Sequence, residues 1–298
     1  MEKNVFTPHP FILTKPEWIP DSKASSCVLC KERFTQVRRR HHCRVCGNVL
    51  CGKCCFEKVY LPQYGDDEQS RVCNACLPVS IMITKARSLQ MASRLESAKS
   101  LADACAEEKM LKKVVETGGV QAIIHLAQTN IADIKETVAE ALNNLALCIP
   151  LHSMVVDCGG VKAICSILSS TGDSHSQATI KALSTLKLLA KSEKLKVLIV
   201  AEGALVPLMA LSMSTNNTTV VLSLTTLGII LENPINVATF AQNFKNGLQT
   251  MLRIAKSNDE KVQEVSLRIL ALLARTTDEL RKKFLKKIIT VEIASKTL

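Results

Sequence analysis

Hydrophobic and polar residues follow two different patterns along the chain. Up to about residue 78 the sequence is rich in charged residues and turn formers and has no long apolar period. After Pro78, aliphatic residues and helix formers dominate, in runs spaced as one face of an α-helix requires. The change predicts a small, loop-rich domain followed by a larger, all-α one. The expected boundaries are a tail over 1–14, a first domain over 15–78, a linker over 79–90 and helical repeats over 91–298.

The helical part repeats a short motif. Residues 114–120 read VVETGGV and residues 155–161 read VVDCGGV, with weaker copies at 199–205 and 244–248. Each copy is followed by a short apolar run and then by a longer amphipathic one. A period near 42 residues with glycine at a helix boundary predicts a solenoid of helices. In such a stack, neighbouring repeats bury the apolar faces that a single repeat leaves open.

Over about residues 88–298 this pattern resembles the armadillo repeat family. The resemblance implies an all-α armadillo-like solenoid that binds protein partners along a groove, often through asparagine side chains that pair with the ligand backbone. Asn144 fits that groove position. The equivalent positions in the other repeats hold Asp103, Thr185, Thr226 and Ile269. We therefore expect partner binding on the helical surface, with Asn144 as a candidate contact and without the peptide-binding mode of the importins.

Composition indicates the kind of core and the kind of binding partner to expect. Apolar residues make up 47% of the 298 residues but aromatic ones only 3%, so the core must be aliphatic, which suits stacked helices. The formal net charge is +11; if eight thiolates bind two Zn²⁺ ions, the eight negative and four positive charges bring it to +7. A basic protein favours acidic partners such as phosphate lipids, nucleic acid or acidic peptides.

The sequence also indicates where the protein works. Residues 1–13 carry no apolar run of the signal-peptide type, and no uninterrupted apolar stretch of about 18 residues predicts a transmembrane helix. We therefore expect a cytoplasmic protein. In a reducing compartment its thirteen cysteines are expected to bind metal in preference to forming disulfides.

Eight of the cysteines form four C-x-x-C pairs within a 50-residue window. The pairs are Cys27/Cys30, Cys43/Cys46, Cys51/Cys54 and Cys73/Cys76. This spacing lets a tight turn place two sulfurs about 2.3 Å from one zinc ion, and two pairs complete a closed tetrahedral site. Because closed sites leave no open coordination position, the cysteines predict two structural zinc ions that supply much of the folding free energy of the first domain.

Three further elements surround these pairs: Trp18 and Asp21 in the pattern W-x-x-D, the block RRHHCR at 39–44, and the RVC segment at 71–73. Together with the eight cysteines they resemble the FYVE zinc finger family. In that family the four pairs interleave, with pairs one and three on one ion and pairs two and four on the other. The resemblance thus implies that Cys27, Cys30, Cys51 and Cys54 bind one zinc ion and that Cys43, Cys46, Cys73 and Cys76 bind the other.

The same resemblance implies binding of phosphatidylinositol 3-phosphate. Arginine suits this ligand because its planar fork matches phosphate oxygens. By the family pattern, Arg39, Arg44 and Arg71 converge on the 3-phosphate, Arg40 faces the 1-phosphate, and His41, His42 and Asp21 meet the inositol hydroxyls, with Trp18 positioning Asp21. If the histidines bind the lipid as imidazolium, binding weakens as the pH rises through their pKa.

FYVE fingers also insert a loop into the bilayer, which here corresponds to residues 34–37. Phe34 is expected to be structural, which leaves Gln36 and Val37 at the tip. Burying one valine is worth only about 1.5–3 kcal/mol, so a single finger is expected to hold the membrane weakly. Stable attachment then needs a second contact, through a homodimer or a bound partner.

These expectations describe an adaptor that is not an enzyme. It is peripheral on early endosome membranes, docks through its finger and recruits a protein through its repeats. A ubiquitin ligase is the first alternative, because RING fingers share the crossed zinc ligation, but the basic block and the W-x-x-D element argue against it. Nucleic-acid binding is supported only by the net charge. After residue 80, His125, His152 and His175 are isolated and form no catalytic constellation.

Overall fold

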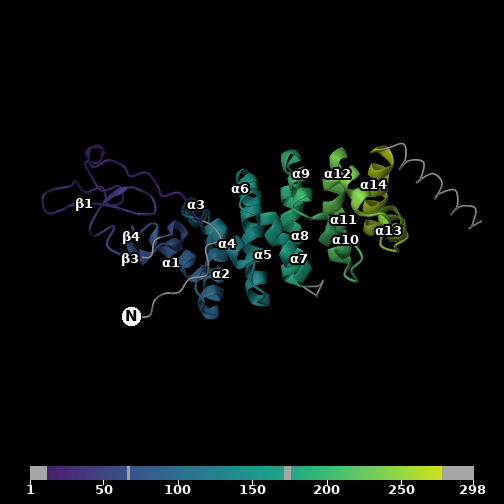
Figure 1. Ribbon diagram of the computed structural model, residues 1–298, viewed down its shortest axis with the longest axis horizontal. Helices are drawn as coiled ribbons and strands as arrows, with labels where there is room; N and C mark the ends of the chain where they lie inside the picture. Colours follow the sequence, from purple (N-terminus) through teal and green to yellow (C-terminus); the bar gives the residue numbers. More distant parts are fainter. Residues whose placement is uncertain (1–11, 66–67, 171–175, 277–298) are drawn as a thin grey trace, which may run out of the picture. The chain divides into compact units, whose positions relative to one another are not determined.

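The computed structural model describes residues 12–65, 68–170 and 176–276 (Figure 1). The chain divides into two compact units, Met1–Leu145 and Ala146–Leu298. The first unit contains the cysteine-rich domain and the first helices. The second consists of helices only, within the described residues.

The cysteine-rich domain is built from short elements. They are η1 (Asp21–Lys23), β1 (Arg40–His42), β2 (Val49–Cys51), β3 (Lys58–Tyr60), η2 (Pro62–Tyr64) and β4 (Gln69–Arg71). Strands β1 and β2 pair antiparallel with His41 opposite Leu50, and β3 and β4 pair antiparallel with Val59 opposite Ser70. Cysteines and a few aliphatic residues, among them Leu61, form the buried cluster. Such a core is too small to hold the domain alone, so bound metal must supply the rest.

Helix α1 (Leu77–Ala86) begins directly after the last cysteine. Its buried residues Val79, Ile83 and Ala86 recur at helical spacing, and the helix packs against α2 (Met91–Ala106). Thr84 Oγ1 donates a hydrogen bond to the Tyr60 carbonyl at 2.8 Å, which joins α1 to β3. The segment 79–90, expected as a linker, therefore contains most of a packed helix, because its apolar residues share one face.

The other helices follow in chain order. In the first unit these are α3 (Glu108–Thr117), α4 (Gly119–Leu126) and most of α5 (Ala132–Leu147). In the second they are η3 (Ile149–Leu151), α6 (His152–Asp157), α7 (Gly160–Ser170), α8 (Gln177–Ala190), α9 (Glu193–Ala201), α10 (Leu205–Leu211), α11 (Asn217–Ile230), α12 (Pro234–Asn243), α13 (Gly247–Ile254) and α14 (Glu260–Thr276). No single described helix is both long and apolar enough to cross a membrane, and one bent pair, Ala132–Leu147 with Ile149–Asp157, passes that test jointly by length and composition.

The repeated motif sits at helix boundaries, as its glycines predict. Gly118, Gly159 and Gly203 adopt φ angles of 91°, 90° and 93°, a left-handed conformation that favours glycine. The glycine that follows has a different task. A Cβ atom on Gly119 would lie 2.6 Å from Val114 Cγ1, so the absence of a side chain lets α3 and α4 pack closely. The first glycine turns the chain and the second admits the neighbouring helix.

In the second unit, successive repeats stack through α8, α11 and α14, which lie in consecutive layers in Figure 1. Their inward residues, including Leu186, Leu227 and Ile269, are fully buried. This stacking supplies the aliphatic core that the composition predicts.

A charged network links the same layers. Buried Lys196 contacts Glu193 and lies 2.9 Å from Glu232, whose other oxygen accepts from Arg268 at 2.5 Å. Burial by itself would lower the pKa of Lys196, but the hydrogen bonds to its two carboxylate partners raise it. The hydrogen bond from Lys196 holds the pKa of Glu232 below its usual range.

Candidate zinc and phosphoinositide site

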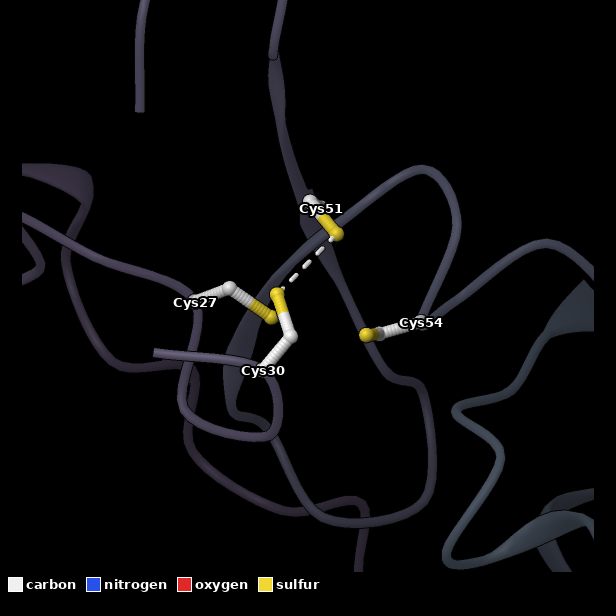
Figure 2. Close-up of side chains that lie close together, drawn as sticks. All are labelled: Cys27, Cys30, Cys51 and Cys54. Carbon is white, nitrogen blue, oxygen red and sulfur yellow. Dashed lines mark hydrogen bonds between the residues drawn. The ribbon is translucent and has the colours of Figure 1, made fainter. Parts of the chain in front are cut away.

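The first group of cysteines joins two distant turns. Cys27 and Cys30 come from an N-terminal turn, Cys51 ends β2, and Cys54 lies one turn later (Figure 2). All four sulfurs lie within 4.8 Å of one another and point inward. The Cys30 and Cys51 sulfurs are 3.8 Å apart. A tetrahedral zinc site with Zn–S bonds of about 2.3 Å has sulfur separations of roughly 3.8 Å, so the group fits Zn²⁺.

The second group satisfies the same distance condition and is more deeply buried. Its members are Cys43, Cys46, Cys73 and Cys76. The Cys43 sulfur accepts N–H groups from Val45 at 3.4 Å and Cys73 at 3.3 Å, and Asn48 Nδ2 donates to Cys46 at 3.2 Å. Such donors favour the thiolate that zinc requires.

The two groups are those that the FYVE resemblance implied, with the first pair joined to the third and the second to the fourth. The basic strand β1 therefore lies between ligands of both sites. Just after it, the backbone N–H of Arg44 donates to the Arg71 carbonyl at 2.9 Å, which holds the RRHHCR block beside the RVC segment. Closed Cys₄ sites of this kind keep no position for a substrate, so the metal's role is structural.

Trp18 lies over the end of the basic block. Its ring stacks on His42, with ring centroids 4.8 Å apart and planes inclined by 14°. The Arg44 guanidinium lies 4.2 Å from the Trp18 ring centroid, in cation–π geometry. His42 Nε2 is 2.8 Å from the Ile19 carbonyl oxygen and 3.6 Å from Asp21 Oδ1. The W-x-x-D element and the basic block thus form one contiguous arrangement.

Gly47 allows this approach. Its carbonyl accepts the Ile19 N–H at 3.0 Å, and a Cβ atom on Gly47 would lie 2.2 Å from the Glu17 carbonyl oxygen. Its φ of 69° also favours glycine. Any larger residue here would displace the segment that carries Trp18.

Alternation along β1 divides the basic residues between two faces. Arg40 shares a face with His42; its Nε donates to the Ala24 carbonyl at 3.1 Å and its guanidinium lies 4.9 Å from the Phe34 ring centroid. Phe34 itself packs against the buried cluster of the finger. His41 belongs to the opposite face, and Arg39, just before the strand, lines the same hollow as His41.

That opposite face borders an open hollow of about 540 Å³. Burial and the charges of Arg71, Arg39 and Arg44 lower the pKa of His41. The hollow is lined by Thr35, Val37, Arg38, Arg39, His41, Cys51, Gly52 and Lys53. Lys53 was not among the residues predicted from the sequence, and the sign available for it was a basic residue in the Cys51–Cys54 turn.

Comparison with known proteins bears on this site. The family model described as the FYVE zinc finger matches residues 17–80. This part of the chain is a FYVE zinc finger. Over 59 residues the chain is 49% identical to the Lateral signaling target protein 2 homolog of Brugia malayi. That match covers 20% of this chain and only 10% of the relative, so the chain spans a small part of the relative's length.

The helical part has relatives among solved structures. A computationally designed armadillo repeat protein for modular peptide recognition superposes with a TM-score of 0.58 at 15% identity, covering 69% of this chain and 86% of that one. An engineered protein gives a TM-score of 0.59 at 24% identity, covering 70% and 50%. At these identities the likeness concerns the fold alone. It confirms the predicted fold class, a FYVE finger followed by an armadillo-like solenoid.

The loop of the FYVE finger presents its predicted tip to solvent. Val37 is 94% exposed, and Gln36 is exposed beside it. Arg38, at the base of the tip, is paired with Glu32 at 2.7 Å. The loop therefore offers one apolar side chain, and part of its positive charge is already matched.

The groove residue predicted on the repeats has an internal contact. Asn144 is half-buried, and its Nδ2 donates to the Ala102 carbonyl at 3.4 Å. Thr185, Thr226 and Ile269, at the equivalent positions, are fully buried. Asn144 as a ligand contact thus stays a prediction.

The helical histidines have structural surroundings. Buried His152 lies 2.7 Å from the Ala146 carbonyl through Nε2, and burial lowers the pKa of His125. His175 lies outside the described residues.

Proposed function

We propose that this protein is an adaptor that binds phosphatidylinositol 3-phosphate through its FYVE finger and recruits protein partners through its helical repeats. One arrangement supports this proposal most directly: the Trp18 ring lies between His42 and the Arg44 guanidinium, and Asp21 is 3.6 Å from His42. His42 ends strand β1, which lies between ligands of the two Cys₄ groups. The match of residues 17–80 to the FYVE family supports the same ligand.

The chemistry of the site suits a phosphomonoester on a hydroxylated ring. A phosphomonoester carries a charge near −1.5 to −2, which arginine forks neutralise in bidentate geometry. Arg44 and Arg71 are adjacent through their backbone bond, and both charges act on His41. Arg39 and Lys53 extend the positive surface into the hollow. We propose that the 3-phosphate binds among Arg39, Arg44 and Arg71 and that Arg40 faces the 1-phosphate.

Asp21 gives the site its selectivity in this proposal. Its carboxylate lies 3.6 Å from His42, so both can meet inositol hydroxyls. A carboxylate accepts hydroxyl hydrogen bonds but repels a further phosphate, which favours a ring with one phosphate besides the 1-phosphate.

The membrane contact follows from the loop. Val37 enters the bilayer as the finger meets the head group, and the protein is peripheral on early endosomes. Because one valine holds weakly, residence there needs a second contact, through a homodimer or a partner on the repeats. Both the finger and the solenoid are binding folds, which supports a role without catalysis.

Flotation of the full chain with vesicles that contain each phosphoinositide in turn tests this proposal. The wild type is expected to float with phosphatidylinositol 3-phosphate, and Arg40→Ala/Arg44→Ala is expected to abolish flotation while two zinc ions per chain remain bound. Lys99→Ala/Lys109→Ala, which removes the same charge from exposed helical positions, is the matched control and should float normally.

Two outcomes would overturn the assignment. Flotation that survives in the Arg40/Arg44 variant means that other residues bind the lipid. If flotation of both double variants depends only on the total negative charge of the vesicles, the protein binds anionic membranes in general and does not recognise a particular head group. Ubiquitin transfer or nucleic-acid binding that depends on Arg40 and Arg44 would favour the alternative functions.

A further inference from the structure

A second hollow, of about 380 Å³, opens between two successive repeats of the second unit. It is bounded by the α10–α11 connection and the α13–α14 connection, in a region where α11 packs on α14 (Figure 1). Val220, Ile254 and Val262 give part of its lining an apolar character. The remaining lining is polar and includes two cationic side chains, Arg253 and Lys256.

Within the described residues neither cation has an acidic partner. Arg253, in the last turn of α13, donates to the thioether sulfur of Met213 at 3.4 Å. Lys256, three residues later, also lines the hollow and makes no ion pair with a described carboxylate. A thioether is a weak acceptor, so the guanidinium retains nearly all its capacity to bind an anion.

The nearby carboxylate of Asp259 is already engaged. One oxygen accepts from Asn217 Nδ2 at 3.0 Å, which ties α11 to the start of α14, and the other accepts the Val262 N–H at 2.9 Å. Asp259 therefore links the two repeats through neutral donors, and among the described residues it forms no ion pair with Arg253 or Lys256.

Asn217 and three serines, Ser212, Ser214 and Ser257, complete the polar lining. Ser212 Oγ already donates to the Met209 carbonyl at 2.8 Å, which leaves the other two hydroxyls. Ser214 Oγ accepts the Asn216 N–H at 3.0 Å, and Ser257 Oγ accepts the Asp259 N–H at 3.2 Å. Each hydroxyl hydrogen remains available for donation, because a serine oxygen that accepts can still donate. The hollow thus presents a guanidinium, an ammonium and two hydroxyl donors around an apolar surface.

We infer that this hollow binds a phosphorylated serine or threonine in an extended segment of the partner protein. The two cations match a phosphate charge of about −1.5 to −2, whereas a carboxylate would neutralise only one. Three phosphate oxygens also use the available donors better than two carboxylate oxygens do. The apolar lining suits an aliphatic neighbour of the phosphorylated residue. The inference rests on the proposed function, because it specifies the chemistry of the partner that the repeats recruit.

The test uses the full chain and a fluorescein-labelled nonapeptide of alanine and leucine with one central phosphoserine, followed by fluorescence polarisation. Arg253→Ala/Lys256→Ala is expected to weaken binding at least tenfold. The control Lys245→Ala/Arg275→Ala removes the same charge from exposed positions outside the hollow and should change affinity less than twofold. Arg253→Lys keeps the charge but loses the fork, and an intermediate loss is expected. Thermal unfolding monitored by circular dichroism verifies that each variant folds.

The peptide variants decide between ligand chemistries. Replacing phosphoserine by glutamate should weaken binding, and replacing it by serine should abolish it. Equal losses in the two double variants, equal binding of the serine peptide, or no wild-type binding at about 1 mM peptide would overturn the inference. The inference would also be overturned if the Arg253/Lys256 variant lost binding to phosphatidylserine vesicles but kept its binding to the peptide. Failure of the lipid proposal can be told apart from failure of this inference, because the first would appear in the flotation assay and would leave peptide binding intact.

Discussion

The FYVE finger and the helical repeats hold their folds by different means. The finger has strands of three residues and a core made largely of cysteines, so two metal sites fix its shape. The repeats bury leucine, isoleucine and alanine from every helix pair of the second unit and use metal nowhere in the described residues. Where metal holds the chain, a small buried cluster suffices, and many side chains between the ligands are left at the surface to recognise a ligand. Where aliphatic packing holds it, recognition is confined to the outer faces and the connections.

Metal removal should separate the two regions most sharply. Cys43→Ser removes a buried ligand of the second site, and because apparent zinc binding in small fingers is worth about 10–16 kcal/mol, the finger is expected to unfold. Helical circular dichroism should fall only slightly, while bound zinc and lipid flotation are lost. Cys148→Ser, which changes a cysteine outside both groups, is the control; equal zinc loss in both variants would contradict the assignment.

A substitution in the core of the repeats should have the opposite effect, destabilising the helices and leaving the zinc sites intact. Leu224→Ala creates a cavity at a fully buried position of α11 and is expected to lower the free energy of unfolding of the second unit by about 2–5 kcal/mol. Urea unfolding followed by circular dichroism measures this loss. Zinc content should stay at two ions per chain. Val206→Ala, at a position 63% exposed, should cost far less.

The charged network of Lys196 and Glu232 should contribute less to the free energy of unfolding, and this contribution should depend on pH. Glu232→Gln leaves buried Lys196 with Glu193 alone and is expected to cost about 1–3 kcal/mol. The folded-state pKa of Glu232 is depressed, so its contribution is fully present above the unfolded value of about 4.3 and is lost as the pH falls through the folded value. Urea unfolding at pH 7 and below pH 4 should therefore show the difference from wild type shrinking in acid. The exposed pair of Lys261 and Glu264 supplies the control Glu264→Gln, expected to cost less than about 0.5 kcal/mol at either pH.

Within the finger, recognition should be separable from folding. Trp18→Ala removes the ring that stacks on His42 and Arg44, and lipid affinity is expected to fall about tenfold, equivalent to roughly 1.4 kcal/mol. Zinc content should remain at two because Trp18 is half exposed and binds no metal. Isothermal titration with a soluble inositol 1,3-bisphosphate head group measures the effect, and loss of zinc along with affinity would show that the ring is part of the fold.

The smallest effect is expected at the loop tip. Val37→Ala removes two methyl groups' worth of apolar surface from a side chain that is 94% exposed, so vesicle binding should weaken by about 1 kcal/mol or less. Titration with the soluble head group should be unchanged, since Val37 acts on the bilayer in this proposal. A loss of head-group affinity equal to the loss of vesicle binding would place Val37 in the head-group site instead.

Several features could be predicted because they depend only on the spacing of residues close together in the sequence. The C-x-x-C pairs predicted turns that carry two sulfurs, and the Gly-Gly motif predicted helix boundaries, where the structure shows the first glycine in a left-handed conformation. Helix α1 was missed because the boundary was set by a change of composition, although Val79, Ile83 and Ala86 already share a helical face. Lys53 was missed because its role depends on a hollow formed by segments distant in sequence.

The sequence by itself determined the fold class, the four C-x-x-C pairs and the basic block, since each follows from residue type and spacing, and the resemblance to FYVE fingers implied which pairs share an ion. Only the tertiary structure decided that Arg39 and His41 line one hollow while Arg40 and His42 share the other face of β1, and that Trp18 stacks on His42. It also decided that Arg253 and Lys256 line one hollow without an ion pair to any described carboxylate, while Asn217 from the preceding repeat binds Asp259. The physical reason is the same in each case: spacing fixes what one segment can present, whereas charge pairing and burial depend on which segments meet.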